Sequence, residues 1–195
     1  MLDESVIETE VDEAKLVERA INLDGNAFGR LYDMHVDKVY RHIYYRVGNE
    51  GDAEHITQQV FLKAWEAIRR YKKTETRFIA WLMTISHTVV IDFCRTRYKR
   101  DKAYLEADIM GNESVPGPEQ ATMACFDQQQ LRRAILQLPK DQQHVILLRF
   151  VEGFRDPEIA SIMGKSEGAI RVILHRGLVA LRLIVEKENE NVEEV

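Results

Sequence analysis

The chain has 195 residues, of which 45% are hydrophobic and 30% are charged, so it can build one or two small domains with buried cores. Its net charge of −5 is unevenly placed, because residues 1–18 hold seven acids and one base, residues 186–195 hold five acids and one base, and the middle is about +5. We expect no membrane insertion and no secretory signal, because no apolar run nears the roughly 20 residues of a bilayer span and the start is acidic. Two cysteines outside any CxxC pair favour a reducing, cytoplasmic location.

Helical spacing of apolar residues runs through the first part of the chain. It predicts a helical block over about residues 12–47, a second helix over about 52–71 and a third over about 76–100. A turn at 48–51 and a polar interruption at 72–77 separate them. We expect these helices to form one domain over residues 19–100, after an acidic N-terminal extension at residues 1–18.

Residues 101–120 contain two glycines and two prolines close together, at Gly111, Pro116, Gly117 and Pro118. Such residues do not propagate a helix, so they predict a flexible linker. Helical spacing returns in a second domain over residues 121–185, and residues 186–195 form an acidic tail. With no useful strand pattern, the sequence predicts an all-α fold with two helical domains joined by a flexible linker.

Residues 154–183 have the pattern of a helix-turn-helix. Asp156 suits a helix N-cap and Pro157 the first helical position, Gly164 suits a tight turn, and Ser166 suits the cap of a long second helix. That helix is predicted to bury one face, which holds Ile170, Ile173, Leu174, Leu178 and Leu181. Its outer face carries Arg171, His175 and Arg182. This geometry enters the DNA major groove, although many helical hairpins only pack on other helices.

Both domains resemble the extracytoplasmic-function (ECF) class of bacterial RNA polymerase sigma factors. Region 2 of that family is similar to DAEHITQQVFLKAWEAI and FIAWLMTISHTVVIDFCRTRYKR, and region 4 is similar to LPKDQQHVILLRFVEGFRDPEIASIMGKSEGAIRVILHRGLVALR. The similarity covers roughly residues 25–185. It implies a promoter-specificity subunit without enzymatic activity, cofactor or metal, which binds core RNA polymerase and promoter DNA and is controlled by an anti-sigma factor.

The resemblance also implies that the helix matching residues 52–68 docks on a coiled coil of the largest polymerase subunits. The expected polymerase contacts are its polar residues Asp52, Glu54, Thr57, Gln58, Gln59 and Lys63. Trp65 is expected to serve the domain core. His55 and Gln59 stand where the family often has acidic residues, which removes negative charge from this face.

The segment 72–100 is implied to recognise the −10 element and to open the DNA. An unpaired base must be captured outside the duplex, and a polar loop beside an aromatic ring can form such a pocket. The expected pocket residues are Lys72, Lys73, Thr74, Arg77 and Phe78. His87 and Thr88 are expected to set base preference, and Trp81 to pack in the core. The cations Arg95, Arg97, Lys99 and Arg100 are expected to contact the phosphate backbone, which positions the protein without specifying sequence.

The second helix of the helix-turn-helix is implied to read the −35 element. Arg171 and His175 are the expected base contacts, because arginine can donate two hydrogen bonds to guanine. Val172 is expected to contact a thymine methyl group. Lys165, Ser166 and Arg176 are expected to bind phosphates near the entrance of the helix.

Two other functions fit parts of the sequence. A stand-alone helix-turn-helix regulator would bind duplex DNA without polymerase, which the acidic net charge disfavours. A metal-dependent hydrolase could use His35, His42, His55 or His87, but no HExxH motif, cysteine pair or glycine-rich phosphate loop accompanies them. The acidic ends could gate DNA access or simply increase solubility.

Overall fold

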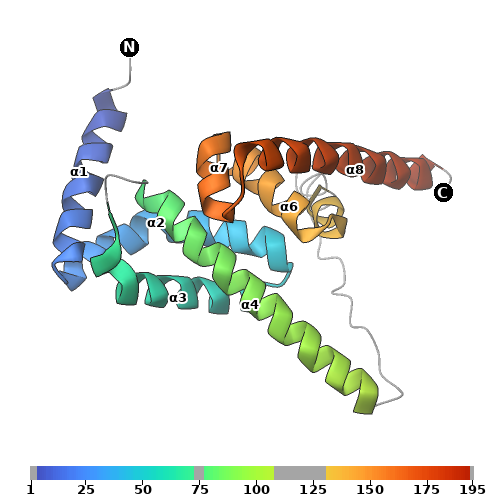
Figure 1. Cartoon of the computed structure of the whole chain (residues 1–195), viewed down its shortest axis with the longest axis horizontal. Coiled ribbons are helices and arrows are strands. Elements are labelled where there is room, and N and C mark those ends of the chain that lie inside the picture. The colour runs from blue at the N-terminus through green and yellow to red at the C-terminus, as the bar shows by residue number, and fades with distance from the viewer. Residues whose placement is uncertain (1–3, 73–76, 108–130, 194–195) are drawn as a thin grey trace.

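The computed structural model describes the backbone of residues 4–72, 77–107 and 131–193 (Figure 1). All regular structure in these ranges is helical, which confirms the all-α fold class. The first half of the molecule comprises α1 (Glu4–Ile21), α2 (Gly25–Val47), α3 (Glu50–Ala67), the short 3-10 turn η1 (Ile68–Arg70) and α4 (Phe78–Ala107). The second half comprises helical residues 131–137, α6 (Lys140–Ile146), the π-helical turn η2 (Leu147–Val151), α7 (Asp156–Met163) and α8 (Glu167–Glu193).

The predicted first block is two helices rather than one. Leu23 has a left-handed φ of 65°, and the Asp24 carboxylate accepts hydrogen bonds from the amides of Asn26 and Ala27 at 3.0 and 3.1 Å. An N-cap of this kind starts a new helix whatever the apolar spacing on either side. The prediction of one continuous block over residues 12–47 is therefore wrong at residues 22–24.

Both acidic ends and the start of the predicted linker are helical. The extension at 1–18 becomes α1 from Glu4, and Leu16 and Val17 are each only 2% exposed, so its last residues belong to the core. The predicted tail continues α8 to Glu193, and α4 continues to Ala107 instead of ending near residue 100. These stretches contain good helix formers, which extend a helix that already has a nucleus. The remainder of the predicted linker, 108–120, lies outside the described residues.

The core of the first half lies between α2, α3 and α4, with α1 packed on α2. Leu31, Ile43, Ile56 and Leu82 are fully buried there. In the second half α6 and α7 pack on α8, and the contact is closest at Gly177, where an added Cβ would lie 3.0 Å from Ile146 Cδ1. Farther along, α8 extends away from the other helices (Figure 1).

The predicted buried face of α8 is only partly buried. Ile170 is fully buried, but Leu178 is 40% exposed. The prediction is therefore wrong for Leu178, because its neighbour Gly177 is the buried residue that packs against α6, which leaves Leu178 at the edge of that contact.

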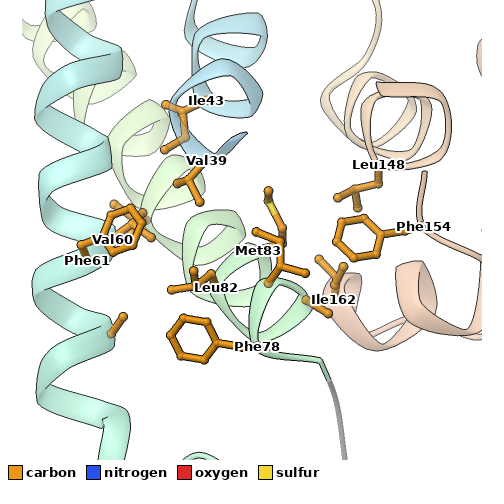
Figure 2. Packing of buried hydrophobic residues seen from close by; sticks show 14 of the residues in the cluster. Val39, Ile43, Val60, Phe61, Phe78, Leu82, Met83, Leu148, Phe154 and Ile162 are labelled. Atoms are coloured by element: carbon orange, nitrogen blue, oxygen red, sulfur yellow. The ribbon is translucent and has the colours of Figure 1, made fainter. Parts of the chain in front are cut away.

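The two halves share one apolar core. In Figure 2, Met83 of α4 points toward Leu148, Phe154 and Ile162 of the second half, and all four side chains belong to a single buried cluster. The helix pair α4 and α7 forms the main contact, and α6 and η2 lie against α2. The sequence predicted two separate domains and did not predict this contact.

One stretch, Phe78–Arg97 within α4, is long and apolar enough by composition to cross a membrane. The expectation that no run comes near this length is therefore wrong. In the folded chain the stretch packs against α2, α3 and α7, so burial in the protein core accounts for its apolar character.

Candidate nucleic-acid interface

The helix α3 packs between α2 and α4 and presents a polar face to solvent. Buried residues such as Ile56, Val60 and Phe61 hold the helix in the core, while Glu54, Gln58 and Lys63 are exposed. The two remaining polar residues are partly exposed. Asp52 accepts a hydrogen bond from Arg97 at 2.8 Å, and Gln59 is hydrogen-bonded to His55 at 3.0 Å.

Thr57 does not belong to this face. Its side chain is 3% exposed, and its hydroxyl donates to the Ala53 carbonyl at 2.7 Å. The prediction that Thr57 contacts a partner is wrong, because its helical position points toward the core. Trp65 packs on Phe28 with ring centroids 5.0 Å apart, as expected for a residue that supports the core.

A groove runs between α3 and α4 along this face. It is lined by His55, Gln59, Lys63, Val89, Asp92, Phe93 and Thr96. Leu62 is 59% exposed on α3, three residues after Gln59 and therefore on the same side of the helix. Sequence reasoning missed the α4 wall of the groove, because the spacing of residues along one helix does not show which helix packs beside it.

The start of α4 carries the residues expected to form the −10 pocket. Lys72 and Arg77 are exposed, whereas Lys73 and Thr74 lie outside the described residues. Phe78 is only 2% exposed, and its ring centroid lies 5.6 Å from those of Tyr71 and Trp81. The prediction that Phe78 lines an open pocket is wrong for this arrangement, because the ring is part of the core.

The second half of the molecule covers part of this segment. Arg77 forms an ion pair with Glu158 of α7, with 2.7 Å between Nη2 and Oε1, and its guanidinium lies 5.3 Å from the ring centroid of Phe154. These contacts place the first helix of the helix-turn-helix directly against the start of α4.

His87 and Thr88, expected to set −10 base preference, lie in different surroundings. His87 stacks on His144 of α6 with ring centroids 4.5 Å apart and planes 17° apart. Burial, and then the charge of Arg46, lower the pKa of His87 to about 4, so the ring is neutral at pH 7. Thr88 is exposed, and its hydroxyl donates to the Thr84 carbonyl at 3.3 Å.

The cation cluster of α4 lies farther along the helix, where Arg97 reaches the start of α3. Arg95 pairs with Asp92 at 3.1 Å, and Arg97 pairs with Asp52 at 2.8 Å. Lys99 and Arg100 belong to α4, but their side chains lie outside the described residues. Both described arginines are about half exposed or more, so these pairs are weak and phosphates could compete for them.

The helix-turn-helix has the predicted turn. Gly164 ends α7 with a left-handed φ of 62°, and the Ser166 hydroxyl accepts the Ala169 amide at 3.2 Å to cap α8. The start of α7 differs by one residue from the prediction. Asp156 is the first helical residue rather than the cap, and the Glu158 carboxylate accepts the Arg155 amide at 2.9 Å.

The reading face of α8 is open. The residues expected to meet DNA are all exposed: Lys165, Ser166, Arg171, Val172, His175 and Arg176. Arg171 lies 3.4 Å from carboxylates of both Asp156 and Glu167, and Lys165 lies 3.2 Å from Asp141. These partners belong to the same half of the molecule, so the first half does not cover the face.

Comparison with known proteins agrees with this geometry. Residues 31–100 match the family Sigma-70 region 2, and residues 128–181 match Sigma-70, region 4. The ECF RNA polymerase sigma factor SigW of Bacillus subtilis is 30% identical over 169 residues, which cover 82% of this chain and 89% of SigW. The chain belongs to the ECF sigma factors.

Other relatives of this ECF sigma factor differ in length. The sigma factor CarQ of Myxococcus xanthus is 32% identical over 85% of this chain and 93% of CarQ. BldN of Streptomyces coelicolor is 37% identical over 86% of this chain, but the match spans only 63% of BldN.

Two solved structures share the fold. RpoE of Bartonella quintana, in complex with the anti-sigma factor NepR, has a TM-score of 0.67 at 23% identity and covers 82% of this chain and 96% of RpoE. CnrH, in complex with the cytosolic domain of CnrY, has a TM-score of 0.68 at 20% identity over 90% of this chain and 98% of CnrH.

Proposed function

We propose that this ECF sigma factor binds core RNA polymerase through the exposed polar face of α3 and directs promoter-specific initiation. The start of α4 would read and open the −10 element, and α8 would read the −35 element. Family membership supports the role, and the observation that carries it is the presence of two candidate DNA-reading elements on two separate halves of one chain. This role requires no catalytic residue and no cofactor, and it belongs in the cytoplasm with the polymerase.

The proposed contacts follow from exposure. For polymerase they are Asp52, Glu54, Gln58, Gln59 and Lys63. For the −10 region they are Lys72, Arg77, Thr88, Arg95 and Arg97, with Lys73, Thr74, Lys99 and Arg100 retained from the sequence. For the −35 region they are Lys165, Ser166, Arg171, Val172, His175 and Arg176.

The two halves must separate for this function. The −10 and −35 elements are about 25 base pairs apart, which is roughly 85 Å along B-form DNA. In the structure the start of α4 touches α7, the helix before the proposed −35 reader, since Arg77 and Glu158 are 2.7 Å apart. The closed arrangement therefore cannot occupy both elements at once, and we assign it to the resting form of the protein.

An anti-sigma factor would act on the equilibrium between the closed arrangement and the separated halves. A partner that covers the α3 face, or that binds only the closed arrangement, would keep the sigma factor from polymerase, because a ligand shifts an equilibrium by its differential affinity for the two states. RpoE and CnrH, which share this fold, were each solved with such a partner or its domain.

Run-off transcription with core polymerase and a two-element promoter tests the proposal. The purified chain should direct a defined transcript, and Lys63→Glu should reduce both polymerase binding and transcript yield. Lys15→Glu, the same charge reversal at an exposed position of α1, is the matched control and should leave both unchanged. A complex with polymerase that never starts transcription would contradict the proposal.

The alternative of a stand-alone regulator is tested with the chain alone. Tight, sequence-specific binding to duplex DNA without polymerase would favour that function. We expect only weak binding that falls steeply with salt, because the chain is acidic overall and its −10 reader is partly covered.

A further inference from the structure

Three histidines from three helices meet where the two halves of the molecule join. His42 of α2 and His144 of α6 are both 0% exposed, with ring centroids 5.1 Å apart. His87 of α4 stacks on His144 with ring centroids 4.5 Å apart. The first half contributes two of these rings and the second half contributes one, so the cluster exists only while the halves are closed.

The cluster is buried at its centre and short of hydrogen bonds. Both ring nitrogens of His42 and His144, and Nδ1 of His87, are buried without a hydrogen-bond partner among the described residues. Arg46 is 3% exposed beside them, and its Nε and Nη1 likewise have no partner in that part of the chain. Glu152 Oε1 is 3.7 Å from His42 Nδ1, which is an ion-pair distance rather than a hydrogen bond.

Charged groups face the cluster from each element packed around it. The cations are Lys38 and Arg46 on α2 and Lys165 at the turn before α8, and the anions are Asp141 on α6 and Glu152 after η2. Lys38 already lies 3.6 Å from Glu152. The surroundings therefore offer little spare negative charge to a protonated imidazole.

These surroundings favour the neutral rings. Burial, and then the charge of Arg46, lower the pKa of His144 well below its ordinary value and that of His87 to about 4. Burial also lowers the pKa of His42, against the opposing effect of the Glu152 carboxylate. Arg46 itself keeps its charge at neutral pH, since burial lowers its pKa only to about 10.

We propose that His42, His87 and His144 form a proton-sensitive latch that holds the two halves together while the rings are neutral and releases them when the rings take up protons. Separation would expose the rings to water, where a charged imidazole is well solvated, and would leave Arg46 no longer enclosed beside them. A proton rather than a metal ion is the ligand, because no group of the described histidines, cysteines and acids has an arrangement that could hold a metal.

The sign of the pH dependence follows from the lowered pKa values. The closed form binds fewer protons than the open form, whose histidines titrate near pH 6.5. Closure is therefore fully stable above that pH and weakens as the pH falls below it. Each histidine protonated only on opening changes the opening constant up to tenfold per pH unit, and for His87 the gap between 6.5 and about 4 allows a total of about 300-fold.

The latch would regulate the proposed function by making the −10 reader accessible at mildly acidic pH. Only this consequence for transcription rests on the proposed function, because opening of the free chain is measured without polymerase. Run-off transcription at pH 7.5 tests the proposed function separately.

The test follows opening and helicity together. We expect the radius of gyration of the full chain, measured by small-angle X-ray scattering in chelator, to increase between about pH 6.5 and pH 4 while far-UV circular dichroism retains the helical signal. A chain that stays compact through this range would overturn the latch. Loss of helix in step with expansion would also overturn it, because acid unfolding would then explain the change.

Histidine variants identify the groups responsible. His42→Gln, His87→Gln and His144→Gln should each reduce the slope of the logarithm of the opening constant against pH by up to one proton, and this slope is read independently of any shift in midpoint. His55→Gln, an exposed histidine on α3, is the matched control and should change neither slope nor midpoint. Unchanged slopes in all three variants would exclude the cluster.

If the variants do not close at any pH, a titration of the wild-type chain tests whether the histidines form the latch. Proton NMR of the histidine rings should show three resonances that titrate below pH 6 and move together with the expansion. Three ordinary titrations near pH 6.5 without expansion would overturn the latch, as would closure that depends on added Zn²⁺ rather than on pH.

Discussion

The two proposed DNA-reading elements of this sigma factor have different contacts with the rest of the molecule. At the start of α4, Arg77 pairs with Glu158 of the other half, and Phe78 is 2% exposed. On α8, Arg171 is 66% exposed, and its carboxylate partners belong to its own half. In the closed arrangement α7 therefore rests against Arg77 of the proposed −10 element, which is still 57% exposed, whereas the carboxylates beside Arg171 lie in its own half. We therefore expect separation of the halves to affect −10 recognition more than −35 recognition.

The asymmetry arises from where the interface lies. The apolar face of α7 rests on the first turns of α4, which bury Met83 against Phe154 and Ile162 (Figure 2). Polar contacts also join the two halves. Gln143 donates to the Tyr45 carbonyl at 3.1 Å, and Arg132 donates to the Gly48 carbonyl at 2.7 Å. The reading face of α8 takes no part in these contacts.

Removing the central apolar contact between the two halves should have the largest effect on stability and on closure. Phe154→Ala deletes a fully buried ring, and we expect it to lower the free energy of unfolding by about 3–5 kcal/mol and to loosen the closed arrangement. Urea unfolding and small-angle X-ray scattering measure the two effects. Phe61→Ala, in the core of the first half, is the matched control and should destabilise without separating the halves. Equal expansion of both variants would contradict the assigned role of Phe154.

Loss of a proposed base contact on α8 should have the next largest effect. Arg171→Ala should weaken holoenzyme binding to its promoter by about 1–3 kcal/mol if the side chain grips a base, and should relax sequence preference at one −35 position. Competition binding against promoters with single base changes in the −35 element measures both the loss of affinity and the relaxed preference. Arg182→Ala, farther along α8 and paired with Glu186, is the control. The same loss on a promoter without a −35 element would rule out base reading.

Loss of the α8 cap should be smaller. Ser166→Ala removes the hydroxyl that accepts the Ala169 amide and should lower the free energy of unfolding by about 1 kcal/mol, whereas Ser166→Asp should retain the cap. Because the Ser166 hydroxyl bonds to an amide of its own helix, the cost should add to that of Phe154→Ala in the double variant. A clearly non-additive result in urea unfolding would show that the cap is coupled to the interface.

The ion pair across the interface should contribute least. Arg77 is 57% exposed, so a double-mutant cycle with Arg77→Ala and Glu158→Gln should give a coupling of about 0.2–1 kcal/mol that falls with salt. The coupling should vanish in the Phe154→Ala background. The Arg95 and Asp92 pair within α4 is the control, and its coupling should persist there. Persistence of the Arg77 coupling would mean that the halves remain joined.

Local signals explain what could be predicted from the sequence. Apolar spacing located the helices, Gly164 and Ser166 marked the turn and the cap of the helix-turn-helix, and the motifs indicated the family. These features depend on neighbours within a few residues, which a sequence displays directly. The cap at Asp24 was also local and was missed, because the apolar pattern continues across it.

Only the tertiary structure decided which surfaces meet. Periodicity indicates that a helix face is buried but not which element covers it, so Thr57 and Phe78 appeared available for contacts although both are in the core. The stacking of His87 on His144 and the burial of Arg46 between the halves join residues far apart in the chain. The sequence by itself indicated the two proposed DNA-reading helices, and only long-range packing determined that α7 rests on α4 while the outer face of α8 stays exposed.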